Sequence, residues 1–175
     1  MTGSAEAKLT VLGLTISDTR TPKSDGCREL ARAFAVELGA TRFDHEIVKD
    51  DADRIRAVVH DSLDRQIDVF VFMGGTGIAP RDVTVETIRP MLTKELDGFG
   101  ELFRARSFDT IGSMSALSRA LGGVIGQTLV FVLPGSPNAV RLALTEVVGP
   151  IALHAHAVTM GDRMRVARDH DGRDR

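Results

Sequence analysis

The sequence predicts an α/β protein in which a mostly parallel sheet lies between two layers of helices. Short apolar runs alternate along the chain with longer segments whose apolar residues recur at helical spacing. Several runs are apolar at every position, as at 69–72 and 129–133, which is typical of strands buried on both faces. The alternation of such strands with helices favours a three-layer α/β/α arrangement.

The first half of the chain contains three expected strands and two expected long helices. Ser24 is a candidate N-cap for the first helix, and Gly39 is a candidate terminator. Thr84 is a candidate cap for a later short helix. In chain order, the expected elements are a strand at 8–16, a helix at 25–38, a partly polar strand near the sheet edge at 41–48, a helix at 51–66 and a strand at 68–73.

The second half is less regular before it returns to the same pattern. We expect a turn at Gly98-Phe-Gly100 and an interruption at Gly122-Gly123. Ser136 is a candidate N-cap for a helix whose first turn contains Pro137, where proline is tolerated. The expected elements are short helices at 101–107 and 113–120, a strand at 128–133 and helices at 137–148 and 150–160.

The composition is ordinary for a globular chain and fits one domain at 8–160, with flexible tails at 1–7 and 161–175. The net charge of −2 gives no electrostatic footprint for nucleic acid. No apolar run approaches the length of a membrane span, and no signal peptide is visible. The single cysteine, Cys27, lies within an amphipathic helix, which predicts a core position. We therefore expect a cytoplasmic protein that contacts neither nucleic acid nor membrane.

A glycine-rich loop, Gly74-Gly-Thr-Gly77, follows the apolar strand at 68–73. Without Cβ atoms, a glycine backbone can approach a ligand closely, and several N–H groups can point at one anion. The loop lacks the Gly-Lys-Ser/Thr of a Walker A motif and the spacing of a dinucleotide fingerprint. It therefore indicates a phosphate site of another kind, although a tight turn is the alternative.

Two acidic residues are candidate metal ligands beside this loop. Asp82 lies just beyond the glycines, and Asp50 follows the second strand. Magnesium in such sites takes one or two carboxylates, with phosphate oxygens and water completing its shell. As alternatives, Asp82 could serve only the helix dipole, and Asp50 or Asp51 could cap the next helix. The five histidines are scattered and predict no metal site.

Three polar loops follow expected strand ends, at 17–24, 74–82 and 134–138. Ligands of open α/β sheets bind outside the carboxyl ends of the strands, so these loops should converge on one site. Ser17 and Asp18 could equally be ordinary loop residues, and Ser136 could act only as a cap. Arg119 could equally be exposed at a helix end.

Four motifs occur in order: Met73-Gly-Gly-Thr-Gly-Ile-Ala-Pro-Arg-Asp-Val-Thr84, Gly98-Phe-Gly-Glu101, Leu117-Ser-Arg119 and Pro134-Gly-Ser-Pro-Asn-Ala139. Together they resemble the MoaB/MogA family of molybdenum cofactor biosynthesis proteins, whose domain also occurs as the G domain of gephyrin. The resemblance covers about residues 8–160, and the run at 107–119 looks closer to MoaB than to MogA. It implies the MogA-like molybdopterin-binding fold.

The resemblance implies a molybdopterin adenylyltransferase, which would use Mg-ATP to adenylylate molybdopterin, release pyrophosphate and prepare the pterin for molybdate insertion. Asp82 would hold Mg²⁺ and orient the phosphates, and Asp50 matches the family's second functional acid. ATP and molybdopterin would be the substrates and Mg²⁺ the cofactor. The residues implied to bind nucleotide or pterin are Ser17, Asp18, Gly74, Gly75, Thr76, Gly77, Ser118, Arg119, Pro134, Gly135, Ser136 and Asn138.

Two other functions compete with this one. The first is a non-catalytic molybdopterin-binding or scaffold paralogue, which would not need both Asp50 and Asp82. The second is a phosphate-ester enzyme such as the CinA-like nucleotide-processing domain. The MoaB-like run at 107–119 argues against this second function. Lys49 stands where many MogA-like chains have proline, but the following carboxylate is kept. The resemblance also implies a homo-oligomer, a trimer or hexamer, and other molybdenum cofactor enzymes are candidate partners.

Overall fold

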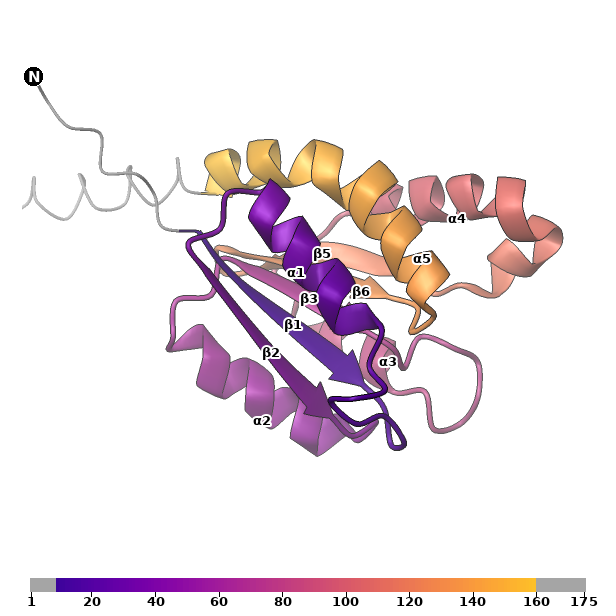
Figure 1. Ribbon diagram of the computed structural model, residues 1–175, viewed down its shortest axis with the longest axis horizontal. Coiled ribbons are helices and arrows are strands. Elements are labelled where there is room, and N and C mark those ends of the chain that lie inside the picture. Colours follow the sequence, from indigo (N-terminus) through magenta and orange to yellow (C-terminus); the bar gives the residue numbers. More distant parts are fainter. Residues whose placement is uncertain (1–8, 160–175) are drawn as a thin grey trace, which may run out of the picture.

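The computed structural model describes residues 9–159, in which six strands form one sheet with the order β2-β1-β3-β6-β5-β4 (Figure 1). The four strands β2, β1, β3 and β6 are parallel, and β5 and β4 continue the sheet in antiparallel pairs. The expectation of a mostly parallel sheet between helices is confirmed. The strands are β1 (Thr10–Ile16), β2 (Arg42–Val48), β3 (Val69–Met73), β4 (Lys94–Glu95), β5 (Leu121–Ile125) and β6 (Thr128–Leu133).

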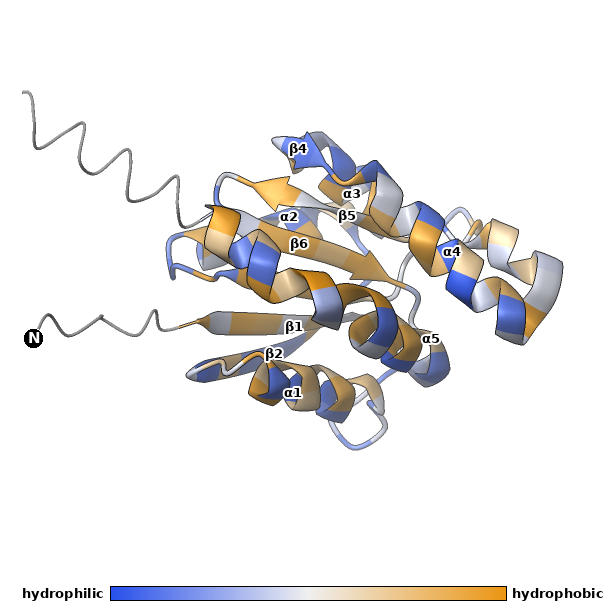
Figure 2. Ribbon diagram, turned by 90° about the horizontal axis from the view of Figure 1, so that it is seen from above, coloured by the Kyte–Doolittle hydropathy of each residue, from blue (hydrophilic) through white to orange (hydrophobic). Residues whose placement is uncertain are grey.

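Helices cover both faces of the sheet, and each face has its own apolar core. One core packs α1, α4 and the C-terminal helix on the sheet, and the other packs α2 and α3. Figure 2 shows apolar strands flanked by helices with mixed polarity. The helices are α1 (Cys27–Glu37), α2 (Ala52–Leu63), α3 (Thr84–Ile88), α4 (Asp97–Ile111) and α5 (Pro137–Leu142), with η1 (Arg89–Met91), η2 (Gly112–Leu117) and the π-helical η3 (Ala143–Val148).

Strand β3 shows why the central strands read as continuously apolar. Val69, Val71 and Met73 pack into one core, whereas Phe70 and Phe72 pack into the other. All five side chains are fully buried. Side chains alternate across a strand, so a strand covered on both faces needs apolar residues at every position. β2 lies at the sheet edge and is only half-buried, which agrees with its partly polar sequence.

The start of the first helix differs from the expectation. Helix α1 begins at Cys27 with Gly26 at the N-cap and no side-chain cap, so Ser24 does not cap it. The Ser24 hydroxyl instead accepts a hydrogen bond from the Thr21 N–H within the loop, at 2.9 Å. Asp25 takes the local role expected of Ser24, because its carboxylate accepts a hydrogen bond from the Cys27 N–H at 3.0 Å. Thr84 likewise is the first residue of α3 rather than its cap.

The region around Gly98 and Gly122 contains more regular structure than expected. Helix α4 begins at Asp97 and includes the expected turn, and the expected interruption at Gly122-Gly123 lies within strand β5. A Cβ on Gly122 would lie 2.7 Å from the Phe99 ring, so a larger residue would push α4 off the strand. These glycines therefore serve close packing rather than a turn.

The two expected C-terminal helices are one continuous helix, Pro137–Thr159. The expected cap at Ser136 is confirmed, because its hydroxyl accepts a hydrogen bond from the Ala139 N–H. By length and composition this helix could cross a membrane, yet its buried apolar residues lie on the face that packs on the sheet: Val140, Ala143, Leu144, Val147, Val148 and Ala152. The expected tails at 1–7 and 161–175 lie outside the described residues.

Candidate functional site

A cleft of about 530 Å³ lies at the carboxyl ends of β1, β3 and β6. The loops after these three strands and Asp50 after β2 line it, so the expected convergence at one sheet edge is confirmed. The lining residues that the sequence singled out are Ser17, Asp18, Asp50, Gly74, Gly75, Thr76, Gly77, Asp82, Pro134, Gly135 and Ser136. Three other candidates, Ser118, Arg119 and Asn138, do not line this cleft.

The glycine loop has a backbone that only glycine adopts readily. Gly74 and Gly75 have φ values of +128° and +63°. A Cβ on Gly75 would collide with Thr84 and lie 2.8 Å from an Asp50 oxygen, and one on Gly77 would lie 2.5 Å from an Asp82 oxygen. Glycine is therefore needed at positions 75 and 77, because Thr84, Asp50 and Asp82 pack closely against the loop backbone.

Three consecutive N–H groups of this loop are available to a ligand. The Gly74 N–H donates to the Leu133 carbonyl at 2.9 Å, which ties the loop to β6. Within residues 9–159, the N–H groups of Gly75, Thr76 and Gly77 donate no hydrogen bond to a protein atom. Unpaired N–H groups beside a cleft form an anion-binding nest.

Asp50 and Asp82 stand on opposite ends of the glycine loop. An Asp82 oxygen accepts a hydrogen bond from the Ala79 N–H at 2.9 Å, and an Asp50 oxygen accepts one from the Val83 N–H at 3.3 Å. Burial raises the pKa of Asp50 above its usual range, and the carboxylates of Asp82 and Asp18 raise it further, against the Val83 hydrogen bond. Asp50 therefore lies in a field that favours the approach of a cation.

The donor set fits a hard divalent cation that is shared with a ligand. Among residues 9–159, no group of three or more His, Cys, Asp or Glu could hold a metal ion by itself. The two carboxylates of Asp50 and Asp82 would supply part of a magnesium shell, with ligand oxygens and water completing it. The buried Thr84 hydroxyl lies beside Gly75 and has no hydrogen-bond partner within the described residues.

Arg119 supports the glycine loop from outside the cleft. Its guanidinium donates to the carbonyl oxygens of Thr76 at 3.3 Å and Asp82 at 3.1 Å, and it forms an ion pair with Glu86. This hydrogen bond from Arg119 is the main reason that the pKa of Glu86 is lowered. The structure therefore gives Arg119 a positioning contact at both ends of the loop, and a direct ligand contact stays a prediction.

Ser118 and Asn138 also have local surroundings that differ from the expectation. The Ser118 carbonyl accepts a hydrogen bond from Arg104, and its hydroxyl accepts one from the Ala120 N–H. Asn138 is the second residue of α5, one position beyond Pro137, and it is exposed. The motifs that contain Ser118 and Asn138 lie next to elements that form the cleft. Their spacing therefore predicted the region of the site but not the direction of these two side chains.

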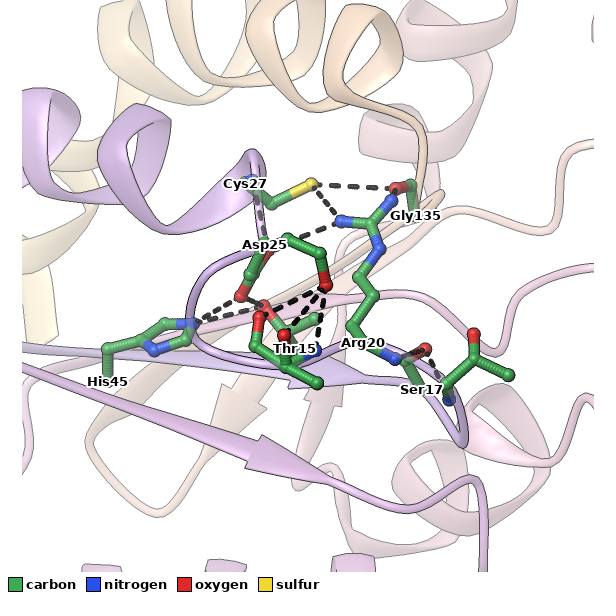
Figure 3. A network of polar contacts seen from close by, with 10 residues as sticks. Thr15, Ser17, Arg20, Asp25, Cys27, His45 and Gly135 are labelled. Atoms are coloured by element: carbon green, nitrogen blue, oxygen red, sulfur yellow. Dashed lines mark hydrogen bonds and ion pairs between the residues drawn. The ribbon is translucent and has the colours of Figure 1, made fainter.

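Sequence reasoning missed Arg20, which lines the cleft. Its side chain points toward Cys27 and Gly135 (Figure 3). Its guanidinium contacts Asp25, Cys27 and the carbonyl of Gly135. Arg20 also lines a second cavity of about 590 Å³, together with Arg28, Phe43 and His45. No local motif marks it, because its partners lie up to 115 residues away.

Four groups form hydrogen bonds or ion pairs with the buried carboxylate of Asp25. Burial acts to raise its pKa, but hydrogen bonds from Thr15, the Cys27 N–H and Arg20, together with the nearby His45, outweigh it and lower the pKa. Thr15 donates at 2.6 Å, and the His45 Nε2 atom lies 3.1 Å from Asp25. Burial lowers the pKa of His45 despite this carboxylate, which favours the neutral imidazole at neutral pH.

These features define a class of protein: an α/β/α protein with a cleft of glycine N–H groups and carboxylates at the carboxyl edge of its sheet. Residues 13–154 match the family described as "Probable molybdopterin binding domain". The chain is 46% identical over 143 residues to molybdenum cofactor biosynthesis protein B of Bacillus subtilis (strain 168), covering 81% of this chain and 84% of that one.

Solved structures of two molybdenum cofactor biosynthesis proteins are also similar to this chain. A crystal structure of molybdenum cofactor biosynthesis protein B matches with a TM-score of 0.83 and 41% identity, covering 90% of this chain and 99% of that one. A structure of MogA matches with a TM-score of 0.78 and 29% identity, covering 86% and 99%. The chain therefore belongs to the MoaB/MogA family of molybdenum cofactor biosynthesis proteins, and by identity it is closer to MoaB, as its sequence motifs predicted.

Proposed function

We propose that the protein is a cytoplasmic molybdopterin adenylyltransferase that uses Mg-ATP and releases pyrophosphate, acting through residues 8–160 as one domain. The observation that carries the proposal is the pairing of Asp50 and Asp82 with three unpaired N–H groups of one loop. A protein that only bound a pterin would need the loop but not two carboxylates over it.

In this reaction the terminal phosphate of molybdopterin attacks the α-phosphorus of ATP, and pyrophosphate leaves. Such transfer needs positioning and charge neutralisation more than a covalent nucleophile. The N–H groups of Gly75, Thr76 and Gly77 would bind phosphate oxygens, and Ser17, Asp18 and the loop at 134–136 would line the substrates. Arg119 would keep the loop in place through the carbonyls of Thr76 and Asp82.

Asp50 and Asp82 would hold magnesium between the glycine loop and the phosphates. When bound there, magnesium supplies positive charge where negative charge moves onto the leaving oxygens. Asp82 is fixed by the Ala79 N–H, so it would orient the cation without moving. The raised pKa of Asp50 means that its ionised form is most stable when a cation is present.

We also propose that the protein works as a homo-oligomer, a trimer or hexamer. Helix α4 and η2 expose large apolar side chains, namely Leu102, Phe108, Ile111, Met114 and Leu117. Exposed apolar patches of this kind mark interaction surfaces. Light scattering of the parent chain and of Phe108→Asp should give an oligomer for the first and smaller species for the second.

The function is tested by incubating purified protein with molybdopterin and Mg-ATP and measuring adenylylated molybdopterin and pyrophosphate. Asp82→Asn and Asp50→Asn should lose product while molybdopterin still binds. Asp51→Asn is the matched control, because Asp51 caps α2 away from the cleft and Asn caps a helix equally well. Tight molybdopterin binding without product at any ATP concentration would instead support the non-catalytic paralogue.

A further inference from the structure

Arg20 reaches from one wall of the cleft to another. It belongs to the loop after β1, where the Ser17 hydroxyl accepts hydrogen bonds from the N–H groups of Thr19 and Arg20 at 3.3 and 3.2 Å. The loop backbone is therefore fixed at the point where the side chain leaves it. At its other end, the guanidinium donates to the Gly135 carbonyl at 2.7 Å, in the loop after β6 (Figure 3).

The guanidinium is held in one orientation by three acceptors. One nitrogen, Nη1, lies 3.2 Å from an Asp25 oxygen and 3.0 Å from the Cys27 sulfur, and Nη2 lies 2.7 Å from the Gly135 oxygen. Asp25 is itself buried and fixed by Thr15 and the Cys27 N–H. A guanidinium has five N–H donors, so two are left beyond these three protein contacts.

Arg20 also lies close to the glycine loop through Gly135. A Cβ on Gly135 would lie 3.2 Å from the Cα atom of Gly74, so the two backbones are in contact. Of the two arginines that line the cleft, Arg81 is exposed and makes no hydrogen bond within the described residues, whereas the Arg20 side chain is only 26% exposed. The cleft therefore has one arginine whose position is fixed before a ligand binds.

We propose that Arg20 is the fixed cation of this cleft, which binds a phosphate group of the substrate and positions the Gly135 carbonyl beside the glycine loop. The inference rests on the proposed function, because it assigns a binding and positioning residue to that site. The chemical class of ligand is a phosphate monoester or polyphosphate. A preorganised guanidinium contributes more to the free energy of anion binding than a mobile lysine does, because its forked donors need little reorganisation when an anion arrives.

The test measures the binding of magnesium pyrophosphate by calorimetry at low and high ionic strength. Arg20→Gln should weaken binding about tenfold or more and reduce its salt dependence, because a charge-assisted contact is lost. Arg20→Lys should keep the salt dependence, weaken binding about threefold or more and speed amide exchange at Gly135 and Ser136, because a single ammonium nitrogen cannot occupy the positions of both Nη1 and Nη2. Arg28→Gln is the matched control, since Arg28 is exposed and outside the cleft, and it should bind as the parent does.

Thermal unfolding of each variant precedes the binding measurement. If Arg20→Gln does not fold, the test rests on Arg20→Lys alone, whose pyrophosphate affinity and amide exchange are compared with those of the parent. Equal affinity and exchange in parent and Arg20→Lys, or no pyrophosphate binding by the parent, would overturn the inference. Loss of binding in Arg20→Gln with no adenylylated molybdopterin from the parent would remove the proposed function and leave the role of Arg20 standing.

Discussion

Gly135 lies directly against Gly74, although 61 residues separate them along the chain, and a Cβ on Gly135 would lie 3.2 Å from the Gly74 Cα atom. This contact brings the loop after β6 onto the loop after β3. Parallel pairing of β3 with β6 sets it, with Met73 opposite Leu133 at the ends of the two strands. The geometry of the cleft therefore follows from the register of the sheet.

Gly75→Ala should unfold more easily and lose adenylyl transfer. The new Cβ would have to occupy a backbone with φ of +63° and would collide with Thr84, so we expect a loss of about 3 kcal/mol in the free energy of unfolding. Gly98→Ala is the matched control in α4, because a Cβ there meets nothing within 4 Å. It should gain about 0.5 kcal/mol, as alanine favours a helix. Urea unfolding of both variants checks this, and equal stabilities would contradict it.

Asp50→Asn should stabilise the fold at neutral pH while it stops the reaction. The raised pKa means that the fold binds the Asp50 proton more tightly than the unfolded chain does, so this favourable contribution is present at acid pH and is lost as pH rises through the folded pKa. Asn keeps the acceptor for the Val83 N–H without the charge. Thermal midpoints measured from about pH 4 to 8 should show the variant above the parent at neutral pH, with the difference closing in acid.

The same series has a control in Asp51→Asn, since Asp51 is exposed and caps α2. At neutral pH its midpoint should follow the parent, because Asn caps a helix about as well as Asp does. An Asp50→Asn variant less stable than the parent at neutral pH would show that the ionised carboxylate stabilises the free protein, contrary to the prediction.

Arg119→Lys should lower the rate of adenylyl transfer about tenfold with a smaller effect on stability, because it leaves the glycine loop less well positioned. A lysine cannot reach the carbonyls of Thr76 and Asp82 and the Glu86 carboxylate together. Glu86→Gln removes only the exposed ion pair and should change the rate little. Steady-state kinetics and amide exchange at 75–79 test this. Unchanged exchange in Arg119→Lys would argue against a role in holding the loop.

His45→Gln should reduce the fall in folding stability that occurs in mild acid. Because the pKa of His45 is lowered in the fold, chiefly by burial, the unfolded chain binds a proton first, and stability falls as pH drops below about 6.5. Gln can still donate to Asp25 but does not titrate. The lowered pKa of Asp25 adds a further loss at lower pH in both proteins. Thermal midpoints measured at about pH 7 and 5.5 check this. The variant His60→Gln is the control, because His60 is exposed.

The sequence predicted the layers, the strand-end loops and most of the cleft because these depend on local pattern. Apolar runs such as β3 and the glycines at 74–77 carry their own signal. Strand β5 was missed because its glycines serve contacts with Phe99 and Leu92, which no local pattern records. Arg20 was missed for the same reason, since its partner Gly135 comes from the other end of the chain. Side-chain direction at Ser118 and Arg119 also depends on neighbours that pair only in the folded protein.

The cleft draws its walls from residues near 17, 50, 75 and 135, so it cannot exist until β6 has joined β3. Pairing of distant strands is a slow step in folding, because the chain entropy of closing long loops must be overcome first. Nucleotide or pyrophosphate added during refolding would therefore bind only chains that have completed the sheet. Such a ligand would leave early folding steps unchanged and raise the thermal midpoint by mass action, in proportion to the logarithm of its concentration well above Kd.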